Sequence, residues 1–164
     1  MKNVKHVKLE QLCKMQSGGT PSRKNIDYWD NGDILWAKIS DLENSPDGYI
    51  YDTEEKITSI GLNSINNRFF PINTLFLAMY GSVGKVAISK KEMSTNQAIL
   101  GINIIDEKVL DIKYLKFWFY NTKTELLDKA VGVALKNISL GLVKNLEIPL
   151  PPLATQRPRT FKAI

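Results

Sequence analysis

Short apolar runs separated by polar turns make up most of the chain, and this pattern predicts a mixed α and β fold. Apolar runs bounded by Gly, Pro, Asn and Ser predict strands at 34–39, 74–80, 85–89 and 97–105. The run 74–80 is apolar almost throughout, which is typical of a central strand buried on both faces. The Gly-rich turn 81–84 joins it to the next strand as a hairpin.

Helical spacing is confined to fewer segments. The long helix predicted at 111–131 has apolar residues at helical intervals, Asp111 as a cap at its start and Gly132 at its end. Thr58 predicts a short helix over 60–65, and Ser139 predicts another through Leu146. Residues 7–15 fit either a short helix or a strand. The proline-rich segment 148–153 predicts an edge strand or an extended exit at a domain boundary.

These elements predict a single α/β (α+β) domain with a twisted, mostly antiparallel sheet and one long packed helix. A chain of 164 residues suits one domain and can bury a substantial core. No apolar run approaches the ~20 residues that span a bilayer. The basic N-terminus lacks the apolar region of a signal peptide. We therefore expect a cytoplasmic protein that does not enter the membrane.

Charge and rare residues narrow the chemistry. The net charge of +5 is compatible with a polyanionic partner, and the dispersed lysines and arginines favour a folded domain with a basic face. The single cysteine, Cys13, and the single histidine, His6, exclude an internal disulfide and a Cys/His zinc site within this chain. We expect Cys13 to be buried. We also expect no metal, no cofactor and no catalytic residue.

The stretch 18–42, GGTPSRKNIDYWDNGDILWAKISDL, combines cations, hydroxyls and aromatic rings in and around one loop. Such groups contact phosphates and bases in nucleic-acid-binding proteins. The alternative is a well-ordered loop whose aromatic residues cap the core. We expect Tyr28, Trp29 and Trp36 to build the fold, and Arg23 and its polar neighbours to be the candidates for contacting a ligand.

Two later motifs are equally ambiguous. The hairpin tip YGSVGK lacks the glycine spacing and the hydroxyl of a nucleotide-binding phosphate loop. Its Ser82 and Lys85 suit either a clamp for a nucleic-acid phosphate or a plain glycine turn. Asn96 and Gln97 suit either bidentate contact with adenine or hydrogen bonds that fix a loop. The segment 133–139 has the same ambiguity.

A metal-dependent nuclease is a further alternative. Asp47, Glu54 and Lys56 superficially match the carboxylate and lysine pattern that holds Mg²⁺ and activates water. However, 52–56 is a polar run without the alternation of a core strand, so we predict a solvated surface loop there.

The order of the motifs is more specific than any one of them. Along the chain come GGTPS, YW..G.ILW.KISDL, ITSIGL, P.NTLFLAMYGSVGKVAIS, TNQAI, YL, G…KNIS and IPLPPL..Q. From about residue 7 to residue 156, this succession resembles the target recognition domain of a type I restriction–modification specificity subunit.

The resemblance implies a non-catalytic subunit with two recognition domains, separated by long helical spacers. Each domain reads one half of a bipartite site in double-stranded DNA. Methyltransferase (modification) subunits dock on the spacers, and a restriction subunit completes the nuclease.

For this chain the resemblance implies a half-subunit or truncated form, for which a second recognition half is a possible partner. We expect a DNA target recognition domain at 1–153. We expect 154–164 to be the truncated start of a spacer region or a disordered tail, because Pro158 disfavours a helix. The missing spacer leaves docking of the methyltransferase in question. A fragment that binds a methyltransferase without reading DNA is therefore another alternative.

The candidate DNA contacts share polar, charged or aromatic side chains within these motifs. They are Ser17, Thr20, Ser22, Arg23, Lys24, Tyr28, Lys38, Ser40, Tyr80, Ser82, Lys85, Asn96, Gln97, Lys136 and Asn137. By side-chain chemistry, the phosphate candidates are Arg23, Lys24, Lys85 and Lys136. The base-edge candidates are Tyr80, Asn96, Gln97 and Ser40.

Overall fold

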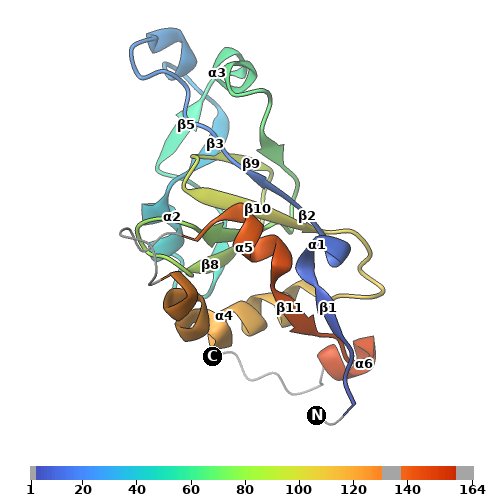
Figure 1. Cartoon of the computed structure of the whole chain (residues 1–164). Helices are drawn as coiled ribbons and strands as arrows, with labels where there is room; N and C mark the ends of the chain where they lie inside the picture. Colours follow the sequence, from blue (N-terminus) through green and yellow to red (C-terminus); the bar gives the residue numbers. More distant parts are fainter. Residues whose placement is uncertain (1–2, 131–137, 158–164) are drawn as a thin grey trace.

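The computed structural model of the chain describes residues 3–130 and 138–157 and contains two main sheets (Figure 1). The larger sheet has five strands in the order β2 (Cys13–Ser17), β10 (Ile99–Ile104), β7 (Leu75–Ala78), β8 (Val86–Ser89) and β4 (Tyr49–Ile50). Its neighbouring strands are antiparallel except for the β4–β8 pair, which is parallel.

The four-stranded sheet lies towards the upper end in Figure 1, beside the 3₁₀ helix η1 (Ile26–Tyr28) and the helix α3 (Ser59–Ser64). Its strand order is β5 (Glu55–Ile57), β3 (Ile34–Ala37), β9 (Met93–Thr95) and β6 (Phe69–Phe70). The β3–β9 pair is parallel, whereas β5 and β6 pair antiparallel with their neighbours. Trp36, Ile57 and Ile65 form a small core within this part.

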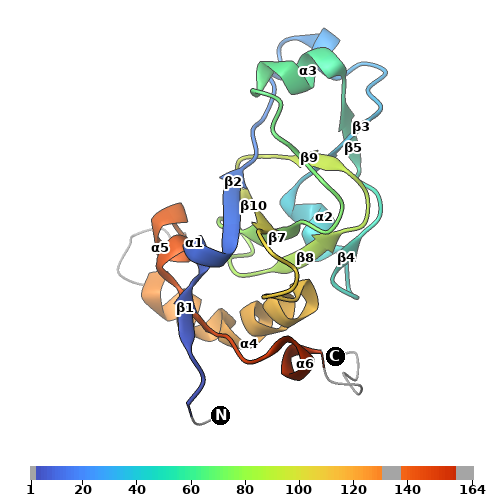
Figure 2. The ribbon, with the colours of Figure 1, turned by 90° about the vertical axis from the view of Figure 1, so that its right-hand side faces the viewer.

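The helix α4 (Ile112–Ala130) lies at the opposite end from α3, under the five-stranded sheet (Figure 2). Beside it are α1 (Leu9–Leu12), α5 (Leu140–Asn145), the antiparallel strands β1 (His6–Lys8) and β11 (Glu147–Pro149), and α6 (Leu153–Gln156). No helix among residues 3–130 and 138–157 has the length and apolar character to cross a membrane.

Alternation along the central strands explains why both faces of the larger sheet are buried. Leu75 and Leu77 of β7 join one core cluster with Leu115 and Phe119 of α4. The intervening Phe76 joins a second cluster on the other face. Because successive side chains of a strand point to opposite faces, the apolar run 74–80 supplies both cores, as its sequence predicts.

The predicted fold class is confirmed, as are the main helix caps. The Asp111 carboxylate accepts hydrogen bonds from Lys113 N at 2.9 Å and Tyr114 N at 3.1 Å, at the start of α4. Thr58 Oγ1 accepts from Gly61 N at 3.1 Å in α3, and Ser139 Oγ accepts from Leu142 N at 3.0 Å in α5. Cys13 is buried, as predicted, and burial raises the pKa of its thiol to about 12.

Several predicted boundaries are wrong. The strand 34–39 ends at Ala37, because the Asp41 carboxylate accepts from Lys38 N at 2.8 Å and starts α2 (Ile39–Glu43). Residues 7–15 are divided among β1, α1 and β2. The predicted surface loop 52–56 includes the start of β5, whose pairing with β3 compensates for the absence of apolar alternation.

A buried amide holds the segment after β11 against the start of α4. Gln156 Nε2 donates to Val109 O and Pro151 O, both at 2.8 Å, and its Oε1 accepts from Asp111 N at 2.9 Å. Arg157 Nε also donates to Asp111 Oδ2 at 2.5 Å. Because a buried amide is costly unless it is hydrogen-bonded, these bonds fix the position of α6.

The two sheets meet where the chain leaves β2. Gly18 N donates to Ile99 O at 3.1 Å, and Gly19 N donates to Thr95 O at 2.9 Å. A Cβ on Gly18 would lie 2.1 Å from Thr95 Oγ1 and 2.2 Å from Thr95 O. Only glycine therefore permits this approach of two backbones.

We predict that Gly18→Ala lowers the free energy of unfolding by more than about 2 kcal/mol, because the added methyl group meets rigid backbone. Urea unfolding followed by circular dichroism measures the change. Gly141→Ala in α5 is the matched control, since beyond its chain neighbours and its own helix backbone the nearest described atom to an added Cβ is Ser139 Oγ, 4.0 Å away. The control is expected to be neutral or stabilising by up to ~1 kcal/mol. Equal unfolding curves for Gly18→Ala and the wild type would contradict this account.

Candidate nucleic-acid interface

The loop between β2 and β3 folds around a pair of tryptophans. The Trp29 and Trp36 rings meet edge to face, with centroids 5.0 Å apart. The Arg23 guanidinium carbon lies 3.8 Å from the Trp29 ring centroid, which is a cation–π contact. Trp29 Nε1 also donates to Ser22 O at 3.0 Å. The tryptophans therefore build the loop, as predicted, and Arg23 is part of the same packing.

Glu55 forms ion pairs with two of the predicted DNA-binding cations. Its carboxylate accepts from both terminal nitrogens of Arg23, at 2.5 and 3.1 Å, and lies 2.9 Å from Lys38 Nζ. Lys38 Nζ also reaches Glu54 at 3.3 Å. Hydrogen bonding from Arg23, followed by that from Lys38, lowers the pKa of the Glu55 carboxyl to about 2. Both cations are thus already paired within the protein and hold the loop against β5.

Other candidates in the loop differ in their contacts. The Lys24 side chain is exposed and forms no ion pair with any residue that the structure describes. Ser22 is also exposed. Tyr28 O accepts from Thr58 N at 2.9 Å, and a Cβ on Gly61 would lie 2.5 Å from it. Tyr28 therefore supports α3, as expected of a residue that builds the fold.

Thr20 and Gln97 meet on the surface from distant parts of the chain. Both residues are exposed, and Thr20 Oγ1 donates to Gln97 Oε1. The neighbouring Asn96 Oδ1 accepts from Ala98 N at 3.1 Å, so its side chain helps to form the turn before β10. Ser17 lies deeper, where its carbonyl oxygen accepts from Arg68 Nη1 at 3.3 Å. Of these residues, Gln97 offers the more accessible amide.

The hairpin tip extends this surface across α2. Ser82 Oγ donates to the Glu43 carboxylate at the end of α2. Ile39 lies under Gly81, 3.7 Å from a Cβ built there. Tyr80 is exposed beside the tip, and Ser40 of α2 is half-buried.

Two backbone contacts connect the β9–β10 turn to the neighbouring parts of this surface. Asn96 N donates to Ala37 O at 3.0 Å, next to the start of α2, and Met79 N donates to Ala98 O at 2.8 Å, next to Tyr80. We define the reading band as the surface residues Thr20, Gln97, Lys38, Ser40, Tyr80 and Ser82. Its members come from the entry loop, the β9–β10 turn, α2 and the hairpin tip.

Not every predicted contact lies in the band. Lys85 lies on the side of the hairpin tip that faces α4, in a cavity with lysines of that helix. Lys136 and Asn137 lie outside the described residues. Glu55 and Arg68 organise the loop but are not among the predicted contacts. Glu55 lies in a polar run that predicts a solvated surface loop, and no local sequence pattern marks Arg68.

The three residues of the alternative nuclease site each contact a different partner. Glu54 reaches Lys38, Lys56 Nζ lies 3.6 Å from Asp52 Oδ1, and Asp47 Oδ1 accepts from Tyr49 N at 3.1 Å. Within 3–130 and 138–157, no group of three histidine, cysteine or acidic residues has an arrangement that could hold a metal ion. These contacts do not assemble the magnesium site that the motif suggests.

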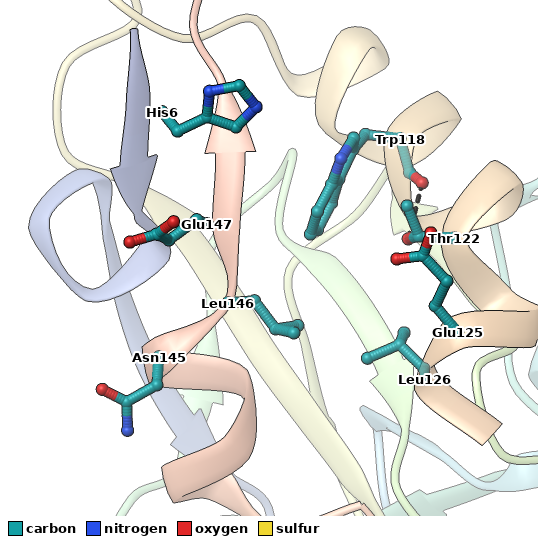
Figure 3. Close-up of a pocket in the computed structure, with 8 residues that line it drawn as sticks. All are labelled: His6, Trp118, Thr122, Glu125, Leu126, Asn145, Leu146 and Glu147. Carbon is teal, nitrogen blue, oxygen red and sulfur yellow. Dashed lines mark hydrogen bonds between the residues drawn. The ribbon is translucent and has the colours of Figure 1, made fainter. Parts of the chain in front are cut away.

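A separate cavity of about 330 Å³ lies between α4 and the β1–β11 pair (Figure 3). Its lining includes His6, Trp118, Glu125 and Glu147, and none of the candidate DNA contacts that lie among the described residues. Its two carboxylates would repel a phosphate. This cavity is therefore not part of the candidate interface.

Comparison with known proteins identifies sequences and folds similar to this chain. The model of a family described as type I restriction modification DNA specificity domain matches residues 1–158. The MjaIX specificity subunit of a type I restriction enzyme from Methanocaldococcus jannaschii is 33% identical over 147 residues, which cover 88% of this chain and 33% of that protein. The HindI specificity subunit from Haemophilus influenzae is 27% identical, over 87% of this chain and 31% of that protein.

Solved structures agree on the fold. One similar chain comes from a structural study of complex assembly and conformational transition in the type I restriction–modification system. It matches with a TM-score of 0.73 at 16% identity, and the match covers 95% of this chain and 36% of that one. The HsdS subunit from Thermoanaerobacter tengcongensis has a TM-score of 0.68 at 15% identity, over 94% and 35%. This chain thus spans about a third of the length of the curated relatives that it matches.

We predict that Glu55→Gln lowers the free energy of unfolding at neutral pH by about 1–2 kcal/mol, a value discounted because Arg23 is half-exposed. Since the folded-state pKa of Glu55 is depressed, its contribution is full above about pH 4.5 and is lost as the pH falls towards about 2. Urea unfolding at several pH values should show the two proteins converging in acid.

Glu54→Gln is the matched control for this experiment. Its side chain is 68% exposed and contacts only one of the two cations, Lys38. We expect a change below about 0.5 kcal/mol. A loss for Glu55→Gln that does not depend on pH, or one no larger than that of the control, would contradict the electrostatic role of Glu55.

Proposed function

The chain belongs to the type I restriction modification DNA specificity domain family, and from this premise we propose that it is a non-catalytic module that binds double-stranded DNA and reads one half of a bipartite site. In this proposal, residues 1–153 are the target recognition domain. The boundary at residue 153 is itself a prediction.

The contact between Thr20 and Gln97 carries the proposal. An amide that contacts adenine must accept a hydrogen bond from N6 and donate one to N7. The Thr20 hydroxyl occupies one lone pair of Gln97 Oε1, which orients the amide. No other described residue hydrogen-bonds the Gln97 side chain, so the second lone pair and both Nε2 hydrogens are available to a base. We therefore assign base reading to Gln97 and a positioning role to Thr20.

The rest of the reading band supports the same assignment. Tyr80 is exposed, and Ser40 and Ser82 have hydroxyls suited to a base edge or a phosphate. Lys24 is the phosphate contact that we favour in the entry loop, because its ammonium forms no ion pair within the described part of the chain. Arg23 and Lys38 act mainly by ordering the loop through Glu55.

We propose partners from the relatives' names, which describe specificity subunits of type I restriction enzymes. The partners would be methyltransferase and restriction subunits, together with a second recognition half that completes the bipartite site.

Selection of binding sites from random duplex DNA tests the function. We expect the purified chain to enrich one short sequence, at low salt because a single half-site buries little surface. Enrichment of no sequence, with uniform weak binding to all duplexes, would contradict reading of a half-site.

We predict that Gln97→Ala relaxes the preference at one position of the selected site and costs ~1–3 kcal/mol there. Thr20→Val should relax the same position to a smaller extent, because the amide remains but loses its orientation. Fluorescence anisotropy with single-base variants of the site measures both effects.

Lys24→Ala is the control for base reading. It should weaken binding to every duplex about equally and reduce the salt slope by roughly one. Urea unfolding shows whether Gln97→Ala keeps the stability of the wild type. If a variant of unchanged stability weakened binding to all duplexes equally, the assignment of base reading to Gln97 would be wrong.

A further inference from the structure

A basic cavity of about 330 Å³ lies between α4 and the β4–β8 edge of the five-stranded sheet. We call it the α4 basic pocket. Four lysines line it, one from the hairpin tip and three from α4, namely Lys85, Lys113, Lys116 and Lys123. The three helical lysines are separated by three and seven residues, a spacing that places them on one face of α4. Tyr49 and Tyr120 also line the pocket.

The charges of the pocket are not balanced by the residues that the structure describes. None of the four lysines belongs to an ion pair formed by the described residues. Lys116 Nζ donates to Asp47 O at 3.3 Å and lies 4.1 Å from the centroid of the Tyr49 ring. Among the described lining residues, Asp47 supplies the one carboxylate against four ammonium groups. Converging like charges are unfavourable unless an anion joins them.

Burial adds to this imbalance at Lys116. Burial of the side chain is the main cause that lowers its pKa, Asp47 raises it, and the charges of Lys113 and Lys90 lower it further. Lys90 Nζ lies 5.3 Å from the Tyr49 ring centroid and thus adds a further cation beside the pocket. A bound anion would offset the cost of holding these ammonium groups together.

We propose that the α4 basic pocket binds a phosphodiester of the DNA backbone and anchors the duplex beside the reading band. Lysine ammonium groups bind phosphate as point charges and do not distinguish bases. The pocket would therefore contribute affinity that is independent of sequence. This inference rests on the proposed DNA-binding function and adds a second contact surface to it.

The hairpin tip favours DNA over another polyanion. Ser82 contacts α2 within the reading band, whereas Gly84 faces α4, where a Cβ would lie 3.0 Å from Lys123 Cγ. One short turn therefore forms part of both surfaces. Because this turn belongs to both surfaces, a duplex read at the band would bring its flanking backbone towards the pocket.

The test is the double variant Lys113→Gln/Lys123→Gln, in which both substituted side chains are exposed. Its affinity for every duplex should fall about equally, and the slope of log K against log salt should decrease by about one to two. The sequence enriched from random DNA should stay the same. Lys14→Gln/Lys108→Gln is the matched control, because it removes the same charge from exposed positions outside the pocket.

Two probes distinguish the outcomes. Inorganic phosphate at constant ionic strength should raise the Tm of the wild type but not that of the pocket variant. An unchanged salt slope in a variant that still selects its site would overturn the pocket assignment while leaving the proposed function intact. Absence of DNA binding by the wild type would overturn both. Binding of polyglutamate that is lost in the pocket variant, with DNA binding unaltered, would instead identify a site for an acidic protein segment.

Discussion

The approach of Gly18 to the Thr95–Asn96 backbone is the constraint on which the rest of the structure depends. At this point β2 of the larger sheet gives way to the entry loop, and β9 of the smaller sheet leads into β10. Trp36 Nε1 donates to Gly19 O at 2.9 Å, and Arg68 Nη1 donates to Gly18 O at 2.9 Å. Backbone contact here brings Thr20 to Gln97 and joins the two sheets into one body.

The entry loop between β2 and β3 is stabilised by charged side chains that the sequence predicts to contact a ligand. Arg23 lies between the Trp29 ring and the Glu55 carboxylate, and Lys38 shares that carboxylate. A cation already paired in this way brings less net charge to a phosphate. The paired cation instead orders the backbone of the entry loop, which carries the neighbouring candidate residues. The proposed affinity for DNA is then expected to depend on the lysines that have no carboxylate partner among the described residues.

Affinity and specificity are thus expected to come from different surfaces. Neutral hydrogen-bonding groups of the reading band suit base edges, where bond geometry distinguishes one base from another. The lysines of the α4 basic pocket suit the backbone, where charge acts on any sequence. The hairpin tip contributes to both surfaces, through Ser82 to the reading band and through Lys85 to the pocket. The effects of substitutions at the two ends of this turn can therefore be measured separately.

The sequence by itself determined the burial of β7, the caps of α3, α4 and α5, and the family resemblance, because periodicity, capping and motif order are local properties of the chain. It did not predict the parallel β3–β9 and β4–β8 pairs or the start of α2. Nor did it distinguish Arg23, bound to a carboxylate 32 residues away, from Lys24, which has no such partner in the described part of the chain. Only the tertiary structure decided these features, since they depend on which distant segments share one surface.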